Sequence, residues 1–242
     1  QHYRARRQRQ MCIRDRFVPI ILPLVYGLVM FRLSAWKLNR TLKNQSSLLA
    51  DKQLLKPIQL LANALDLESI SVNIYEIEPV NGLAAPDGKI FITRGFYNKF
   101  TSGEVTGNEL ASVIAHELGH VALGHTRRRM IDFSGQNALR VALGSILSRV
   151  LPGIGGIVAN VLSNLLMARL SRADEFEADE YASALMIKSG IGVKPQISMF
   201  EKLEKLSGNN GNLQPAWLLS HPKTNKRIEK IQENVSKWDA NK

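Results

Sequence analysis

Residues 112–130, SVIAHELGHVALGHTRRRM, hold three of the chain's five histidines. Four positions separate His116 from His120, so a helix would place both rings on one face, one turn apart. Two imidazoles so placed can bind one zinc ion through ring nitrogens at about 2.0–2.1 Å. Glu117 would lie about 100° farther round the helix, where its carboxylate can take a proton from an attacking water molecule and deliver it to a leaving amine. The spacing therefore predicts a metal-dependent hydrolytic site.

A catalytic zinc ion takes three protein ligands and keeps one position open. His125 would lie about 140° round a continuous helix from His120, so we interpret it as a helix-end or packing residue. The better candidates lie in LSRADEFEADEYA, residues 170–182. There Glu175 and Asp179 are four positions apart and share a helix face. We expect Glu175 to ligate the zinc and Asp179 to hydrogen-bond a ligand histidine.

The predicted helix around the histidines is largely apolar, which indicates that these polar groups are buried. Buried histidines and glutamates need partners, and a metal ion supplies them. Histidines that are merely hydrogen-bonded in a core are the alternative interpretation. The apolar residues that support burial are Leu110, Val113, Ile114, Leu118 and Val121.

The surrounding pattern predicts an α+β fold that is mostly helical. Apolar residues recur at helical spacing over 49–67 and alternate as in a strand over 70–77. The turn residues Asn81-Gly82 and Pro86-Asp87-Gly88 flank a second strand at 89–93. The remaining predicted elements are helices over residues 109–129, 170–189, 195–206 and 224–238.

The first sixteen residues are unusual, with six arginines, one aspartate and the chain's one cysteine, Cys12. Residues 6–16 can be back-translated into a sequence that resembles a widely used transposase-type library adapter. We hypothesise that residues 1–16 are not native and leave them out of the fold prediction; a genuine basic arm is the alternative. Without Cys12 the chain has no cysteine, which excludes disulfides and says nothing of the redox compartment.

Residues 17–31 carry no charge, but as a helix they would measure only about 22 Å. Extended to Trp36, with Arg32 snorkelling towards the interface, they reach spanning length. We therefore predict a transmembrane anchor over residues 17–36; a signal-peptide core is the alternative, with a poor cleavage pattern. The positive-inside rule favours the cytoplasmic side for the domain after the span, whereas the arginines of residues 1–16, if native, favour the other side. The basic residues after the span are Arg32, Lys37, Arg40 and Lys43.

A second apolar stretch, residues 150–168, is uncharged for nineteen positions. Pro152 and the glycines after it break this stretch near its start, which leaves a helix too short to cross a membrane alone. We interpret the stretch as an apolar hairpin that contacts either the membrane surface or the core. A full membrane span is the alternative.

HELGHVALGH, followed about fifty residues later by SRADEFEAD, resembles the gluzincin membrane metallopeptidases typified by HtpX and the CAAX prenyl proteases, including the Oma-type quality-control proteases. The resemblance covers most of residues 51–230. It implies a zincin-like α+β fold and one zinc ion per chain. The implied zinc ligands are His116, His120 and Glu175, and Glu117 is implied as general base and acid.

Two further segments carry the resemblance. EPVNGLAAPDGKIFITRG, residues 78–95, is similar to the family's edge-strand region, and LLSHPKTNKRI, residues 218–228, to its late His-Pro element. The second implies that His221 and Arg227 stabilise the tetrahedral oxyanion; an ordinary helix start with a surface arginine is the alternative. The chain departs from the family in having no lipidation cysteine and no evident four-span layout. The first segment implies that substrate backbone pairs near Asn81, Gly82, Leu83 and Ala84.

These observations predict a zinc-dependent metalloendopeptidase domain over residues 37–242. It would cut membrane-associated or misfolded proteins in protein quality control, at a bacterial inner membrane. The alternative is a membrane-tethered binding or chaperone module with a structural zinc, but such a zinc would close its fourth position with another cysteine or histidine. The net charge of +11 also invites a nucleic-acid interpretation, but the sequence contains no recognised nucleic-acid motif, and the three arginines after His125 suit a helix end or an anionic lipid surface. We expect polypeptide substrates and membrane lipid as partners.

The hypothesis that residues 1–16 are not native can be tested directly. We expect that amplifying and resequencing the locus from source DNA will not return the codons for these residues. Finding the same codons in the source DNA would refute the hypothesis.

Overall fold

The computed structural model describes residues 25–26, 28–85, 87–125, 128, 143–144, 146–208, 221 and 225–240, without the side chains of residues 162, 166–170, 204–208 and 239–240. The chain divides into two compact units. Residues 1–38 and 127–166 form the smaller unit, and residues 39–126 and 167–242 form the larger unit.

A four-stranded sheet lies in the larger unit, with the strand order β1-β2-β4-β3. β2 and β4 are parallel and central, and the edge strands β1 and β3 each run antiparallel to their neighbour. All four residues of β4 are buried, as expected of a central strand covered on both faces. The strands are β1 (Ser46–Leu48), β2 (Val72–Tyr75), β3 (Gly82–Ala84) and β4 (Ile90–Thr93).

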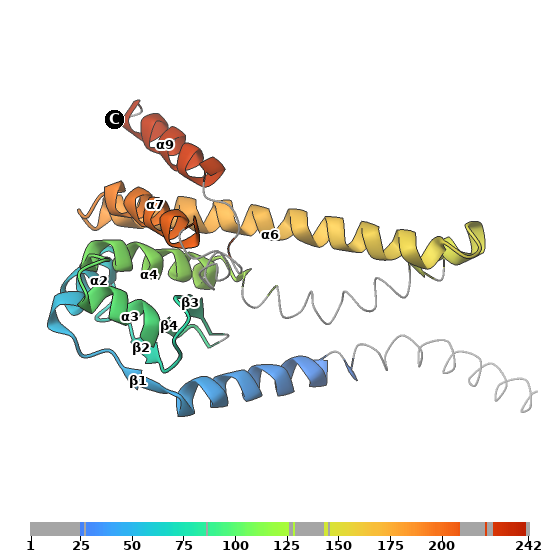
Figure 1. Ribbon diagram of the computed structural model, residues 1–242, viewed down its shortest axis with the longest axis horizontal. Coiled ribbons are helices and arrows are strands. Elements are labelled where there is room, and N and C mark those ends of the chain that lie inside the picture. Colours follow the sequence, from blue (N-terminus) through green and yellow to red (C-terminus); the bar gives the residue numbers. More distant parts are fainter. Residues whose placement is uncertain are drawn as a thin grey trace, which may run out of the picture. The chain divides into compact units, whose positions relative to one another are not determined.

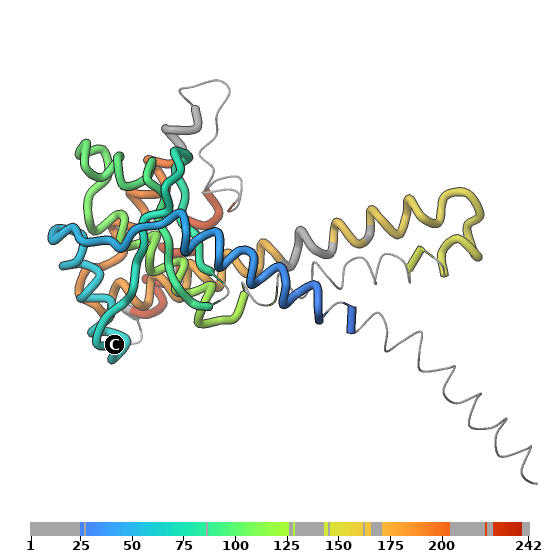
Figure 2. Tube along the Cα trace, turned by 90° about the horizontal axis from the view of Figure 1, so that it is seen from below, coloured from blue at the N-terminus to red at the C-terminus, as the bar shows by residue number. Residues whose placement is uncertain are grey.

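Helices pack around this sheet, and α4 lies between the sheet and the helices α6 and α7 (Figure 1). In Figure 2, which is seen from below, the strands lie in front of α7. Every residue of α4 from Glu109 to His120 is buried except Leu118. The helices are α2 (Lys52–Ala64), α3 (Arg94–Thr101), α4 (Gly107–Ala122), α6 (Gly155–Lys188, of which residues 167–188 belong to this unit), α7 (Lys194–Gly208) and α9 (Asn225–Ala240).

A capping box starts α4. The Thr106 side chain accepts a hydrogen bond from the Glu109 backbone N–H, and the Glu109 carboxylate accepts one from the Thr106 N–H at 2.8 Å. The Glu109 carboxylate is buried and also binds α7, because it accepts hydrogen bonds from Ser198 Oγ and Lys202 Nζ. This one glutamate therefore fixes both the start of α4 and its position against α7.

In the smaller unit, residues 28–38 and 146–150 are helical, and the chain turns at residues 151–154 before α6 begins. Gly153 has a positive φ of 85° in this turn. A Cβ atom at Gly155 would lie 2.4 Å from the backbone of Leu147, so only glycine fits there. Several large apolar side chains of the unit are exposed, among them Val150, Ile157, Val161 and Leu165.

The predicted anchor over residues 17–36 lies partly outside the described residues, which include 25–26 and 28–36 of it. Among the described residues, no helix combines the length and the apolar character that a membrane crossing requires. The anchor therefore stays a prediction, as does the foreign origin of residues 1–16, which lie wholly outside the described part.

The structure corrects four details of the predicted elements. α6 begins at Gly155 rather than at residue 170. The helix of the histidines ends at Ala122 rather than at Arg129, because Gly124 adopts a positive φ of 71° and its N–H bonds the Val121 carbonyl. Gly82, predicted in a turn, is the first residue of β3. The elements β1 and α3 were not predicted, since they are too short to show a clear period.

We expect Thr106→Ala to lower the free energy of unfolding by about 1 kcal/mol, because it removes the N-cap of α4. This would lower the Tm by about 2–4 °C, measured by circular dichroism. Ser236→Ala, at an exposed hydroxyl inside α9, is the control and should leave the Tm nearly unchanged. Equal melting temperatures of the two variants would contradict the role given to the capping box.

Candidate metal centre

Four buried side chains bring their donor atoms together in the larger unit. His116 and His120 come from α4, Glu175 comes from α6, and His221 precedes α9. One donor atom of each lies within 4.8 Å of the others. The Nε2 atoms of His116 and His120 are 3.1 Å apart. Glu175 Oε2 lies 3.4 Å from the first of them, and Glu175 Oε1 lies 3.5 Å from the second. The three ligands predicted from the sequence therefore meet at one point.

The His221 ring lies beside the three predicted ligands, with one nitrogen within 4.8 Å of a donor atom of each. Its Nδ1 lies 2.6 Å from Glu175 Oε2 and 3.4 Å from His116 Nε2. On the other side of the ring, Nε2 lies 3.5 Å from Glu117 Oε1. The sequence predicted His221 at the active site but not its contact with the metal ligands, which depends on how the chain returns before α9.

Glycine at position 119 allows α4 to approach α6 closely. A Cβ atom there would lie 3.0 Å from the Ala178 carbonyl oxygen and 3.1 Å from its Cα. These distances are shorter than ordinary van der Waals contacts. The missing side chain therefore lets His120, the next residue, face Glu175 across the two helices.

Charge in the cluster favours a divalent cation. The carboxylates of Glu117, Glu175 and Asp179 are buried, and Arg227 is the buried guanidinium beside them. With neutral histidines, these four groups carry a net charge of −2. Glu117 Oε1 is buried and accepts no hydrogen bond from the described residues, which is costly without a polar partner. Imidazole nitrogen and carboxylate oxygen are donors that zinc accepts, so the site fits a zinc ion.

The pKa shifts of His116 and Glu175 also indicate that the buried carboxylates favour a positive charge at the cluster. Burial lowers the pKa of His116, but its hydrogen bonds with Asp179 and Glu175 outweigh burial and raise the pKa to about 9. Burial raises the pKa of Glu175, but its contacts with His116 and His221 hold the pKa well below the usual value. The carboxylates thus favour a positive charge at the cluster, whether a proton or a metal ion supplies it.

Asp179 contacts the His116 ring at Nδ1, the nitrogen that faces away from the other donors. Its Oδ1 lies 2.9 Å from His116 Nδ1, so it accepts the ring N–H and leaves Nε2 directed at the other donors. Arg227 binds the same carboxylate through Nε at 2.5 Å and Nη2 at 2.7 Å, a bidentate pair. Burial raises the pKa of Asp179, but the Arg227 guanidinium outweighs it and holds the pKa low. Asp179 therefore stays ionised, as an acceptor must.

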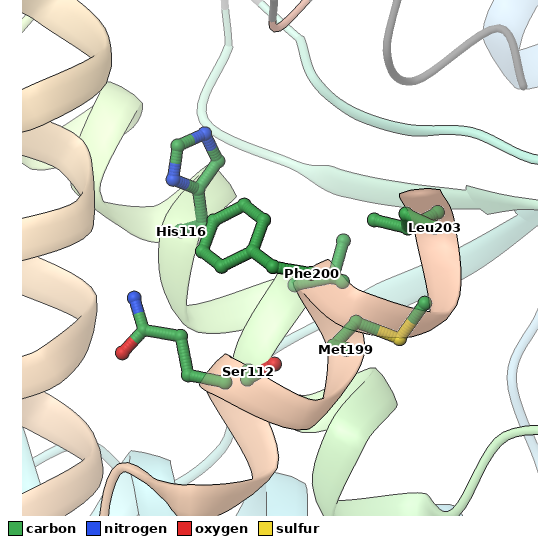
Figure 3. Close-up of a pocket in the computed structure, with 7 residues that line it drawn as sticks. Ser112, His116, Met199, Phe200 and Leu203 are labelled. Carbon is green, nitrogen blue, oxygen red and sulfur yellow. The ribbon is translucent and has the colours of Figure 1, made fainter. Parts of the chain in front are cut away.

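Apolar side chains of α7 pack around His116 and Arg227. The Arg227 guanidinium lies 4.6 Å from the centre of the Phe200 ring, a cation–π contact. Figure 3 shows the same ring beside His116, above Met199 and Ser112. A cavity of about 10 Å³, close to the minimum for one water molecule, lies between α4 and α7. Its lining consists of Ser112, Val113, His116, Gln196, Met199, Phe200 and Leu203.

The edge strand β3 lies next to Glu117. A Cβ atom at Gly82 would be 2.9 Å from Val113 and 3.5 Å from Glu117 Cγ, so the glycine lets the strand backbone approach α4. Among the described strands, β3 pairs only with β4. The Asn81 side-chain oxygen just before the strand is buried and accepts no hydrogen bond from the described residues. The predicted substrate-binding residues 81–84 therefore lie beside the predicted general base.

His125, which we interpreted as a helix-end or packing residue, lies just after the end of α4 and is fully buried. The angle of about 140° assumed a continuous helix, but the turn at Gly124 returns the chain, and His125 Nδ1 lies 3.0 Å from His120 Nδ1. The signal in the sequence was the glycine before the histidine, a common helix-ending residue.

Comparison with known proteins identifies relatives of the chain. Residues 48–235 match Peptidase family M48. The chain is 31% identical to Metalloprotease LoiP of Escherichia coli (strain K12), over 77% of this chain and 73% of that protein. It is 28% identical to Metalloprotease YcaL of the same organism, over 76% and 70%. It is also 24% identical to human Metalloendopeptidase OMA1, mitochondrial, over 68% of this chain and 32% of that protein.

We expect Gly119→Ala to weaken both the fold and zinc binding, because the new methyl group would press on the backbone of α6. The variant should be less stable by about 1–3 kcal/mol, measured by thermal unfolding, and should bind less zinc. Gly156→Ala is the matched control: it is also a helical glycine, and a Cβ there meets nothing within 4 Å. The close approach would be disproved if both variants behaved alike.

Proposed function

This chain belongs to peptidase family M48 and is a zinc-dependent metalloendopeptidase, and we propose the roles that its own residues take in that activity. His116, His120 and Glu175 hold the zinc ion. The support is their convergence within 4.8 Å and their burial on two helices that touch at Gly119. When bound, zinc polarises a peptide carbonyl and lowers the pKa of a water molecule.

Glu117 is the general base and then the general acid. It takes a proton from the attacking water at Oε1 and delivers it to the leaving amine. The observation that carries this role is the buried Glu117 Oε1, which has no hydrogen-bond partner among the described residues and lies beside the ligand histidines and β3. This oxygen is therefore available to accept the proton of the attacking water when the substrate is bound.

The substrate binds as an added strand along β3. An edge strand offers backbone N–H and C=O groups for such pairing, and Gly82 to Ala84 form this edge. The short distance between Gly82 and Glu117 would bring a peptide bond of the added strand close to the general base. The buried Asn81 side-chain oxygen would gain a partner from the same peptide.

His221 stabilises the oxyanion, with Arg227 acting through it. The His221 ring lies between Glu117 and Glu175. Its Nδ1 is engaged with Glu175, so a hydrogen on Nε2, the nitrogen on the Glu117 side, would donate to a developing negative charge. Arg227 donates to the His221 carbonyl oxygen at 3.4 Å, while its Nε and Nη2 donate to Asp179. Arg227 thus holds His221 and Asp179 in place.

The substrates are membrane-associated or misfolded proteins. The resemblance to quality-control proteases supports this, and so do the predicted anchor over residues 17–36 and the exposed apolar side chains of the smaller unit. These side chains would contact membrane lipid at a bacterial inner membrane, with the larger unit on the cytoplasmic side by the positive-inside rule. The alternative of a binding or chaperone module with a structural zinc is set aside, because the chain belongs to a peptidase family.

We expect Glu117→Gln to lose at least about 10²-fold in casein cleavage while it still binds about one zinc ion per chain. The detergent-purified parent should cleave casein, and a chelator should stop it. Glu180→Gln, which changes an exposed carboxylate of α6, is the control and should cleave like the parent. Cleavage by Glu117→Gln at the parental rate would exclude Glu117 as the base, and zinc without any cleavage by the parent would favour a structural zinc.

A further inference from the structure

His125 lies where the chain turns back at the end of α4. Leu123 and Gly124 end the helix, and the positive φ of Gly124 returns the chain towards His120. The His125 side chain is fully buried, and its ring centre lies 5.2 Å from that of His120. Both ring nitrogens of His120 thus have neighbours: Nε2 faces the donors of the metal cluster, and Nδ1 lies 3.0 Å from His125 Nδ1.

The hydrogen bonds in this contact can have only one direction if His120 is a metal ligand. A neutral imidazole that coordinates through Nε2 carries its hydrogen on Nδ1. His120 Nδ1–H must then donate, and His125 Nδ1 must accept. Accepting at Nδ1 places the hydrogen of a neutral His125 on Nε2.

Two carboxylates lie near the hydrogen on His125 Nε2. His125 Nε2 lies 3.1 Å from Glu177 Oε2 and 3.7 Å from Asp174 Oδ1. The Asp174 side chain is buried and the Glu177 side chain is 54% exposed. The chain of hydrogen bonds therefore begins at the metal cluster and ends on the exposed Glu177 carboxylate of α6, with the buried Asp174 carboxylate 3.7 Å from the same nitrogen.

We propose that His125 is a positioning residue that accepts the hydrogen bond of His120 at Nδ1 and donates a second one from Nε2 to Glu177, with the Asp174 carboxylate nearby. It thereby fixes the tautomer and the ring orientation of His120 towards the metal. The inference rests on the proposed function, since it requires His120 to be a zinc ligand. His116 receives the same kind of support directly, from Asp179 at 2.9 Å, so the two histidines of α4 are oriented by different means.

A competing interpretation uses the same residues. Donor atoms of His125, Asp174 and Glu177 lie within 4.8 Å of one another, a separation that would suit a second cation. The two arrangements exclude each other, because a metal ion bound to His125 Nε2 would displace the hydrogen that the carboxylates accept. The hydrogen-bonded arrangement predicts one zinc ion per chain.

The test measures zinc affinity by chelator competition and the absorption spectrum of the cobalt-loaded protein, using the full chain in detergent. His125→Phe keeps a ring but removes the acceptor, and we expect it to lose about 10–100-fold in zinc affinity and to change the cobalt spectrum. His125→Asn should restore much of the affinity, because its amide oxygen can accept in place of Nδ1. Glu177→Ala should lose less than His125→Phe, since Asp174 remains.

Controls separate this inference from the proposed function. Glu180→Ala removes an exposed carboxylate of the same helix and should bind zinc like the parent. His120→Ala should lose far more affinity than His125→Phe; if it binds like the parent, His120 is no ligand and both proposals fail. If His120→Ala fails to bind while His125→Phe binds like the parent, only the positioning role is overturned. It is also overturned if His125→Asn is as weak as His125→Phe, or if the parent binds two zinc ions and Glu177→Ala binds one.

Discussion

The close approach of α4 to α6 is the constraint on which the site depends. Glycine at position 119 removes the side chain that would hold the backbones apart, since a Cβ would lie 3.0 Å from the Ala178 oxygen. Glu175 precedes Ala178 by about one helical turn, so the contact sets it opposite His116 and His120. The same contact leaves these polar groups out of reach of bulk water, and each must then find a partner inside the protein.

Charge within this dry region is organised around the Asp179–Arg227 pair. A buried ion pair gives little net stability by itself, because desolvation offsets the attraction. Its value here is geometric: the guanidinium fixes a carboxylate that in turn fixes His116. In the proposed mechanism Glu175 binds the zinc ion and Glu117 transfers the proton, so the two tasks fall to carboxylates with different partners.

Residue spacing was sufficient to predict which side chains share a face of one helix. It was insufficient for contacts that depend on how the chain turns after a helix ends. The pairs His116–His120 and Glu175–Asp179 each lie on one helix face, so a zinc-dependent hydrolytic site could be predicted from their spacing. The family was predicted from the resemblance of the two motifs to known metallopeptidases, and the family match confirms it together with the metalloendopeptidase activity. The position of His125 depended on a helix end set by one backbone angle at Gly124. The contact of His221 with Glu175 depended on packing between segments far apart in the chain. The individual site roles and the membrane anchor stay predictions.

The proposed ligands His116, His120 and Glu175 come from two separate segments of the chain, and His221 beside them comes from a third. An unfolded chain would have to close loops of several dozen residues to gather them, which costs conformational entropy. A metal ion that binds only the gathered arrangement therefore stabilises the whole fold, by an amount that grows with the free metal concentration. The resting abundance of such an enzyme would track the zinc supply of its compartment, because chains without metal unfold more often and are degraded sooner.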